Sequence, residues 1–285
     1  MKKLVILFLF ALFLVNLVQN VSGQAQVLDP PRDGVFDKIN SLERKPIPYC
    51  ALREADVVWS NRIWRTIDMR QKINQVFYYP ENPYANWRNF TTVIMDALKE
   101  GTINAYMDIP TNEFTMPMTY QEIMGRLEKL DTQQLARPYP PYDLYDTVIA
   151  TKFNTSDVKM IRIKEDIFFD KQRSQQDVRI IGLCLVRDNY LDDGTFRARE
   201  PLFWLYFPEI RQVLAKAEVF NRFNDAERRT FDDIFWKRMF DSYIYKEKNV
   251  YDRRITDYAQ GLDALLESER IKNDLFKFEH DLWEF

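Results

Sequence analysis

The chain has 285 residues, of which 29% are charged and 15% are aromatic, and its formal net charge is −3. This composition is typical of a globular protein and excludes an intrinsically disordered chain, which would carry fewer aromatic residues. The mild acidity argues against a nucleic-acid-binding protein and against electrostatic attachment to anionic lipid, since both need a basic face.

The first 23 residues are organised like a secretory signal peptide. Lys2 and Lys3 precede the apolar run Leu4–Val18, and small residues suited to cleavage precede Gln24. The run has 15 residues, which is shorter than the ~20 that a helix needs to cross a bilayer. Removal of residues 1–23 would leave 262 residues with a formal net charge of −5, enough for one large domain or two small ones.

The two cysteines, Cys50 and Cys184, would then lie in an oxidising compartment, where a disulfide between them is one alternative. Such a bridge would close a loop of about 130 residues and stabilise the fold by up to ~5 kcal/mol in the chain-entropy model. The other alternative is a buried free thiol at Cys184, because its neighbours in Ile180–Val186 are apolar on both faces. No cysteine lies near the cleavage site, so we expect attachment to a membrane only through partners.

Residues 24–50 contain four prolines, Pro30, Pro31, Pro46 and Pro48. Because proline fixes φ and cannot continue a helix, we interpret this stretch as an extended arm that precedes a globular domain spanning residues 51–285. An arm that becomes ordered on a partner and a leader that is disordered in the isolated protein both fit this composition.

The segment Leu52–Val76 is expected to form a helix. Its apolar residues Trp59, Ile63 and Ile67 are spaced by four, which would place them on one stripe of a helix. The segment contains no glycine, and the break at Tyr79-Pro80 follows it.

Trp64, Arg62 and Arg65 fall outside the apolar stripe of this predicted helix. A tryptophan flanked by arginines away from the core is typical of a protein docking surface, because both residue types are enriched at binding hot spots. The alternative is that Trp64 covers a second element of its own domain.

Further elements follow before an internal break in the chain. The pattern predicts a helix over 87–100 that ends at Gly101, a strand over 102–107 and a helix over 120–130. Thr119 and Glu122 are placed to form a capping box at the start of the last of these. The proline-rich residues 137–142 are the strongest internal break and could separate two lobes.

Beyond this break the hydrophobic period changes to two, which is typical of strands. Strands are predicted at 147–153, 160–169, 178–186 and 201–207, and helices at 208–219, 225–245 and from Gly261 onward. Because short loops join these strands without intervening helices, we expect an antiparallel meander. The predicted fold class is therefore α+β: an antiparallel β-meander packed with several α-helices, long C-terminal helices and an extended N-terminal arm.

Residues that could carry chemistry are sparse. The mature chain has one histidine, His280, and the cysteines are too scattered to join it in a zinc site. Asp232 and Asp233 would point about 100° apart on a helix, so they could not act on one substrate as a glycosidase pair does. Asp192-Asp193-Gly194 is better interpreted as a turn than as a calcium site. Because phosphate-binding glycine motifs are also absent, we predict no catalytic, cofactor or metal site.

Aromatic side chains are expected on more than one face of several elements. Trp204 lies in the predicted strand 201–207 with phenylalanine and tyrosine neighbours, and Trp236 lies in the predicted helix 225–245. Such a surplus needs either a thick internal core or a partner surface, and the residues alone favour neither.

Three segments resemble one known family: LREADVVWSNRIWRTIDMRQKINQVFYYP at 52–80, REPLFWLYFPEIR at 199–211 and FDDIFWKRMFDSYIYKEKNVYDRRI at 231–255. They are similar to the gliding-motility and type IX secretion subunit family called GldN or PorN, found in the Bacteroidetes. The resemblance covers most of the chain after about Pro48. It implies a non-enzymatic periplasmic subunit, associated with the inner face of the outer membrane through its partners. Such subunits form a ring with an outer-membrane lipoprotein and contact the periplasmic part of an inner-membrane motor.

Combined with this resemblance, the aromatic and arginine pattern gives a set of expected partner-binding residues: Arg53, Trp59, Arg62, Trp64, Arg65, Trp204 and Trp236. Two other classes of protein stay open. One is a peptidoglycan-binding module, in which exposed aromatic rings would stack on glycan. The other is a cell-wall hydrolase that would use a carboxylate pair.

Overall fold

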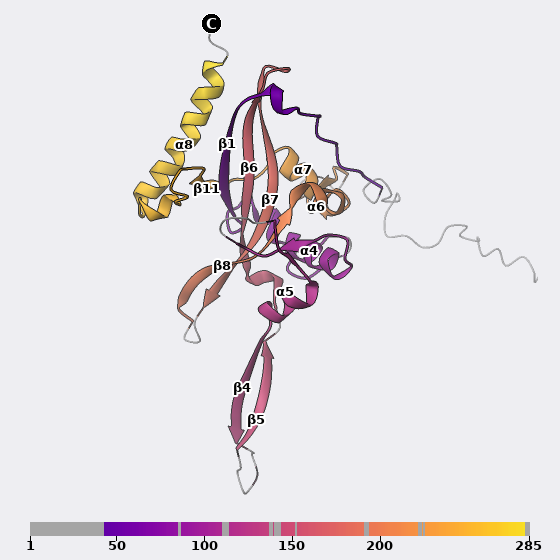
Figure 1. The fold of residues 1–285 in the computed structure, drawn as a ribbon. Coiled ribbons are helices and arrows are strands. Elements are labelled where there is room, and N and C mark those ends of the chain that lie inside the picture. Colours follow the sequence, from indigo (N-terminus) through magenta and orange to yellow (C-terminus); the bar gives the residue numbers. More distant parts are fainter. Residues whose placement is uncertain are drawn as a thin grey trace, which may run out of the picture. The chain divides into compact units, whose positions relative to one another are not determined.

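A computed structural model describes residues 43–84, 87–109, 114–136, 139, 144–151, 153–190, 194–221, 224 and 226–282. Residues 40–285 form one compact unit. Its centre is a seven-stranded antiparallel sheet with the strand order β11-β1-β6-β7-β8-β2-β3 (Figure 1). The predicted signal peptide and most of the predicted arm lie outside the described residues.

The sheet is built mainly from five strands: β1 Val57–Asp68, β6 Val158–Asp170, β7 Gln175–Tyr190, β8 Phe196–Tyr206 and β11 Tyr243–Glu247. Two short strands, β2 Ala105–Tyr106 and β3 Pro117–Met118, extend it beyond β8. Consecutive strands β6, β7 and β8 pair with one another in antiparallel fashion. The predicted meander is therefore confirmed, and it follows from alternating β-branched and polar residues that suit a pleated, half-buried surface.

Two smaller two-stranded sheets lie outside this order. One pairs β9 Glu218–Val219 with β10 Arg229–Thr230, and the other is a hairpin of β4 Lys129–Ala136 and β5 Leu144–Thr151. The predicted break at 137–142 falls between β4 and β5 and lies almost entirely outside the described residues. Strands from before and after it share the central sheet.

The helices are α3 Gln75–Tyr78, α4 Phe90–Lys99, α5 Tyr120–Leu127, α6 Phe207–Leu214, α7 Phe231–Trp236 and α8 Leu262–Asp281, with 3-10 turns η1 Glu54–Asp56, η2 Thr155–Asp157 and η3 Ile255–Asp257. The predicted capping box of α5 is confirmed, because Thr119 Oγ1 accepts from the Glu122 amide and the Glu122 carboxylate accepts from the Thr119 amide. Gly101 follows α4 with a φ of +70°, as a helix stop requires. Within the described residues, no helix combines the length and the apolar character needed to cross a membrane.

The helix predicted over Leu52–Val76 is wrong, because most of this segment is the strand β1. A spacing of four is even, so Trp59, Ile63 and Ile67 share one face of a strand as well as one stripe of a helix. The β-branched residues of the segment favour the strand, and β6 supplies a partner along its whole length. Trp64, at an odd offset, points to the opposite face.

The helix predicted over residues 225–245 is also wrong. The segment contains β10, the six-residue helix α7 and the first three residues of the strand β11. Arg238 follows α7 with a positive φ of 52°, which turns the chain before β11 begins. The predicted helix over 208–219 is shorter than expected, since α6 ends at Leu214 and β9 follows.

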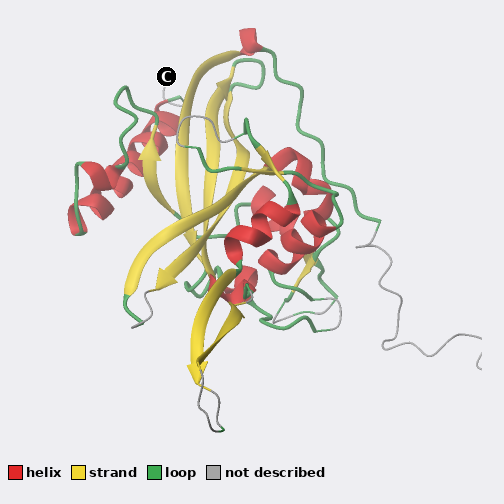
Figure 2. Ribbon diagram, turned by 60° about the horizontal axis from the view of Figure 1, so that its bottom comes forward, coloured by secondary structure: helices red, strands yellow, loops and turns green. Residues whose placement is uncertain are grey.

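One face of the sheet carries most of the hydrophobic core. Ile67, Ile163 and Leu183 on this face pack with α4, α6 and α7, and rings of Phe77, Phe90, Phe207, Phe231 and Phe235 fill the space between these elements. Nearer β11, Ile63 and Ile167 on the same face pack against Ile271 and Leu275 of α8. Figure 1 and Figure 2 accordingly show α8 beside the β11–β1 end of the sheet, with α4, α6 and α7 toward β7.

Both ends of the central sheet are short strands. At one end, the backbone amide of Ile244 in β11 donates to Ser268 Oγ of α8 at 2.9 Å, so the helix binds the outer edge of that strand. At the other end, β3 has two residues and begins with Pro117, which has no amide hydrogen to donate.

Candidate functional site

The predicted partner-binding residues that lie on strands are found on both faces of the central sheet. Trp64 and Trp204 meet on the face opposite the main core, where they pack with Met160, Cys184 and Val186. Their exposed fractions are 8% and 2%, so both tryptophans stabilise the sheet from within the folded chain. Gly182 lies beside them, and a Cβ at this position would overlap the ring of Phe114 that covers this part of the sheet.

The arginines of β1 are engaged in ion pairs. Arg62 donates to both carboxylate oxygens of Asp166 at 2.6 and 2.8 Å, across the β1–β6 pair. Arg65 points to the other face and pairs with Glu165, whose side chain is fully buried. Arg238, in the turn after α7, donates to the same carboxylate at 2.8 and 3.3 Å. Glu165 therefore ties the strand β1 to the turn that leads into β11.

Trp59 and Arg53, the other predicted residues of the segment 52–80, differ in how far the rest of the chain covers them. Trp59 packs against Phe278 of α8, with 4.3 Å between ring centroids. Arg53 precedes β1, pairs with Asp56 at 2.8 Å and keeps 72% of its side chain exposed. Its pKa is raised by the hydrogen bond and the charge of Asp56.

Trp236, at the end of α7, belongs to a stack of aromatic rings and guanidinium groups that binds the N-terminal arm. We call this stack the arm-binding ladder; it consists of Phe168, Arg179, Tyr49, Arg211 and Trp236. The Arg179 guanidinium lies 5.2 Å from the ring centroids of both Phe168 and Tyr49. The Arg211 guanidinium lies 4.6 Å from the Tyr49 centroid and 4.8 Å from the Trp236 centroid. Tyr49 and Trp236 also contact each other, with 5.3 Å between centroids.

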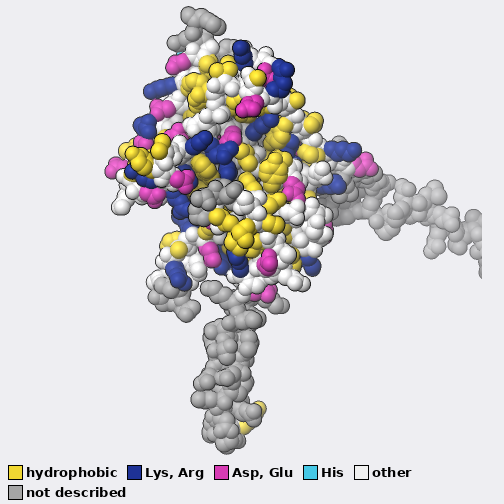
Figure 3. Space-filling model, viewed as in Figure 1, with side chains coloured by type: hydrophobic (Ala, Val, Ile, Leu, Met, Phe, Trp, Pro, Cys, Tyr) yellow, Lys and Arg dark blue, Asp and Glu magenta, His cyan; other side chains and the backbone are white. Residues whose placement is uncertain are grey.

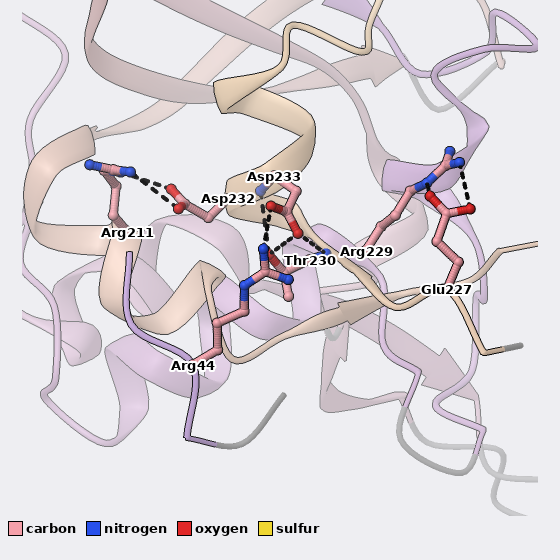
Figure 4. Close-up of polar contacts among 7 residues, drawn as sticks. All are labelled: Arg44, Arg211, Glu227, Arg229, Thr230, Asp232 and Asp233. Atoms are coloured by element: carbon pink, nitrogen blue, oxygen red, sulfur yellow. Dashed lines mark hydrogen bonds and ion pairs between the residues drawn. The ribbon is translucent and has the colours of Figure 1, made fainter. Parts of the chain in front are cut away.

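Two carboxylates of α7 bind arginines beside the ladder, one arginine from α6 and one from the arm (Figure 4). Asp232 accepts from the Arg211 guanidinium at 2.8 and 3.2 Å in a buried bidentate pair. Asp233 accepts from Arg44 of the arm at 2.6 Å and from the Thr230 amide at 3.1 Å, which caps α7. The prediction that Asp232 and Asp233 point apart is confirmed, because each carboxylate binds a different arginine.

A third ion pair in Figure 4 lies away from the arm. Glu227 binds Arg229 at 2.8 and 3.0 Å at the start of β10. The hydrogen bond from Arg229 lowers the pKa of Glu227, and that from Glu227 raises the pKa of Arg229. Both side chains are exposed enough for this pair to contribute little to stability.

The arm lies against a part of β7 that has no second strand partner. Pairing between β7 and β8 begins only at Gly182, so the first part of β7 is beyond the end of β8. There Arg179 donates to the backbone oxygen of Cys50 at 2.6 Å. Each described hydrogen bond between residues 43–52 and the rest of the domain has a side chain as its donor, its acceptor or both. The arm is therefore held by a few side-chain contacts and not by a strand ladder.

Tyr49 is the residue of the arm that carries most of these contacts, and sequence reasoning missed it together with Arg179 and Arg211. Burial raises the pKa of Tyr49, although the positive charge of Arg211 opposes the shift. The neutral phenol therefore persists in the folded chain at physiological pH. The only signal in the sequence was the tyrosine at the end of a proline-rich stretch, with no indication of which arginines would meet it.

Cys50 and Cys184 are both free in the structure. Cys50 is exposed next to Tyr49, whereas Cys184 is fully buried in β7 and packs with Trp64 and Trp204. Burial raises the pKa of the Cys184 thiol, which keeps it protonated and unreactive.

No group of three or more His, Cys, Asp or Glu side chains in the described part of the chain could hold a metal ion. His280 is exposed near the end of α8, with its ring 6.5 Å from that of Phe276. The predicted turn at Asp192-Asp193-Gly194 lies outside the described residues except for Gly194.

The protein therefore has an α+β fold in which stacked rings and guanidinium groups bind a segment of the same chain. The sequence model of the family described as gliding motility associated protein GldN matches residues 52–284, and the chain belongs to this family. The resemblance seen in three segments of the sequence is therefore confirmed. The family is one of gliding-motility proteins and is not a known enzyme family. None of the curated proteins compared with the chain matches it.

Replacing Tyr49 by Ala should loosen the arm without unfolding the domain. Each cation–π contact contributes about 0.5–2 kcal/mol, so a loss of about 1–2 kcal/mol in arm docking is expected. Trypsin should then cut the Arg44–Lys45 bond about 5–30 times faster, as measured by mass spectrometry of the cleaved chain. Ile47→Ala, at a side chain that is 57% exposed in the same arm, is the matched control and should leave the rate unchanged. Equal cleavage of both variants and the parent would show that the ladder does not hold the arm.

Proposed function

We propose that this chain is a non-enzymatic structural subunit of the type IX protein secretion and gliding-motility machinery. It works in the periplasm, where it forms a ring complex with an outer-membrane lipoprotein and contacts the periplasmic part of the inner-membrane motor. The observation that carries the proposal is the match to the GldN family over residues 52–284. The signal-peptide pattern of residues 1–23 supports export from the cytoplasm.

The exposure of two predicted residues supports a role for them in contacts with those partners. Among the predicted set, Arg53 and Trp236 are exposed, with 41% of Trp236 accessible, whereas the Arg62 side chain is 38% exposed and is paired with Asp166. Arg53 and Trp236 both flank the bound arm, one at its end and one beside Tyr49. An exposed tryptophan beside arginines has the composition of a binding hot spot. Trp64, Trp204 and Arg65 support this surface indirectly by holding the sheet together.

The visible surface also suits an assembly subunit that binds protein. On the face drawn in Figure 3, Lys and Arg side chains are interspersed with Asp and Glu, and hydrophobic side chains lie between them. A basic face for nucleic acid or anionic lipid would instead gather one sign of charge. Apolar patches bordered by polar and charged side chains fit the core and rim of a protein–protein interface.

Co-expression of the mature chain with the outer-membrane lipoprotein should give one large complex on size exclusion. Trp236→Ala should weaken this complex by about 2 kcal/mol, or roughly 30-fold in Kd, because truncation removes a hot-spot ring. Tyr251→Ala, at another exposed aromatic residue, should have no effect. Trp236→Ala also removes a ring contact of Tyr49 and so affects the arm. Tyr49→Ala measures the effect of loosening the arm while the Trp236 indole is kept. Separate elution of the two proteins would sink the proposal.

Sedimentation with purified cell-wall sacculi tests the second class of protein. A peptidoglycan-binding module would sediment with sacculi by itself, whereas a ring subunit should do so only in the presence of its lipoprotein partner. A hydrolase would release soluble muropeptides and lose this activity on replacement of a carboxylate pair. The ion pairs of Asp232 with Arg211 and of Asp233 with Arg44 favour the structural role for that pair.

A further inference from the structure

A small pocket opens on the face of the sheet opposite the main core. We call it the Arg162 pocket; its volume is about 130 Å³. Its aromatic lining is formed by Trp64, Trp204 and Tyr245, and its cationic lining by Arg162, Lys246 and Arg254. The pocket therefore gathers the two tryptophans that the sequence singled out as docking residues, and its lining holds three basic and three acidic side chains.

The carboxylates of the pocket are already satisfied by donors. Asp108 accepts from Trp204 Nε1 at 2.6 Å. Asp252 forms an ion pair with Lys246 at 2.6 Å, and the Lys246 ammonium lies 4.6 Å from the centroid of the Trp64 ring. The third carboxylate, Asp257, accepts from the backbone amide of Arg254 at 2.8 Å.

Arg162 differs from these residues, because its guanidinium is half-buried and lacks an anionic partner. Within the part of the chain that the structure describes, it makes neither a hydrogen bond nor an ion pair, and its guanidinium carbon lies 5.2 Å from the centroid of the Tyr245 ring. A guanidinium carries five N–H donors in a planar fork that matches a carboxylate. Partly buried charges without partners are costly, so binding of an anion here would be favoured.

The size of the pocket limits what can enter it. Sites for cofactors and whole small molecules are usually about 300–1,000 Å³, so this pocket suits a single side chain better than a nucleotide or a sugar. A free monovalent anion gains little from one shallow site, because it must offset its own loss of freedom. When the carboxylate belongs to a second polypeptide, the other contacts of the interface help to offset the loss of freedom on binding.

We propose that the Arg162 pocket binds the carboxylate of an Asp or Glu side chain of a partner polypeptide. The carboxylate pairs with the Arg162 guanidinium, and the methylene groups of the side chain lie on the rings of Trp64 and Trp204. The part of the proposal that places the carboxylate on a polypeptide rests on the proposed function as an assembly subunit. The part that makes the ligand a carboxylate rests on the pocket alone. This gives the buried tryptophans a role as the floor of a recognition site.

The test uses the full mature chain and two probes of matched shape, N-acetylglutamate N-methylamide and N-acetylglutamine N-methylamide. Binding is followed through the indole N–H signal of Trp204 in NMR spectra. The glutamate probe should shift this signal with a millimolar Kd and bind at least tenfold more tightly than the glutamine probe. Arg162→Gln should abolish this preference, and Arg162→Lys should retain part of it. Arg253→Gln, in the loop next to the pocket, is the matched control and should stay within twofold of the parent.

Equal binding of the two probes, or an unchanged Kd in Arg162→Gln, would overturn the proposal. Sodium acetate and sodium phosphate distinguish the source of the anion. If either binds as tightly as the glutamate probe, the site is one for free anions and the polypeptide occupant is wrong. These measurements need no lipoprotein, so their failure is distinguishable from failure of the complex to form. The unfolding midpoint of each variant confirms that the fold is intact.

Discussion

Phe235→Ala should destabilise the protein by about 3–5 kcal/mol, the largest effect that we expect from a single substitution. Phe235 of α7 is fully buried, and its ring lies 5.3–5.7 Å from those of Phe77, Phe90 and Phe207. Truncation would leave a cavity between the helices and the sheet, because three packed rings cannot all relax into it. The loss should appear as a lower urea midpoint of unfolding, followed by far-UV circular dichroism, with an unchanged slope.

Phe276→Ala provides the comparison for this result. Phe276 lies on the outer side of α8 with 66% of its surface exposed, so its truncation should change the free energy of unfolding by less than about 0.5 kcal/mol. Similar midpoints for the two variants would contradict the packing described for α7. The same pair of variants also reports on solubility, since only Phe276→Ala removes exposed apolar surface.

Glu165→Gln is expected to cost about 3 kcal/mol of unfolding free energy, within the range observed when one member of a buried ion pair is removed. The carboxylate is fully buried and receives hydrogen bonds from both Arg65 and Arg238. The amide has a similar shape but places an N–H₂ group against a guanidinium and leaves positive charge without compensation. Urea unfolding followed by tryptophan fluorescence measures the change.

The neighbouring residue Asp166 supplies the control, because it also pairs with an arginine of β1. The Arg62–Asp166 pair keeps 38% and 29% of its two side chains exposed, so solvent screens it. Asp166→Asn should therefore cost less than about 1 kcal/mol. Equal effects of Glu165→Gln and Asp166→Asn would show that the buried carboxylate does not connect β1 with the turn after α7.

Much of the fold could be predicted from local patterns. The alternation in 160–169 and the apolar run in 178–186 identified β6 and β7, and Thr119 with Glu122 identified the start of α5. Where the pattern failed, the period was ambiguous. A spacing of four fits a helix and a strand equally, and the decision depends on a partner strand about 100 residues away that no local signal reveals. The prediction of one helix over 225–245 failed for a related reason. The aromatic rows of α7 continue into β11, so the pattern does not show where the short helix ends.

The candidate site was less accessible to sequence reasoning than the fold. Trp236 was singled out for its aromatic neighbours, but its partners Tyr49 and Arg211 are set by tertiary contacts. Arg44 and Asp233 are separated by 189 residues and Arg179 and Cys50 by 129, so their hydrogen bonds leave no local trace. The position of Trp64 outside the apolar stripe did indicate a second face. Only the sheet, however, shows that this face is covered and that its tryptophans line a pocket beside Arg162.

The protected ends of the central sheet restrict how copies of this chain can associate. With the Ile244 amide bound by Ser268 and with Pro117 opening β3, neither terminal strand offers a long run of free amides to a neighbour. Continuous sheets running from one molecule into the next are therefore disfavoured at these positions. Higher-order structures should then be joined by side chains of loops, helices and the exposed face, which allows subunits to separate without unzipping backbone hydrogen bonds.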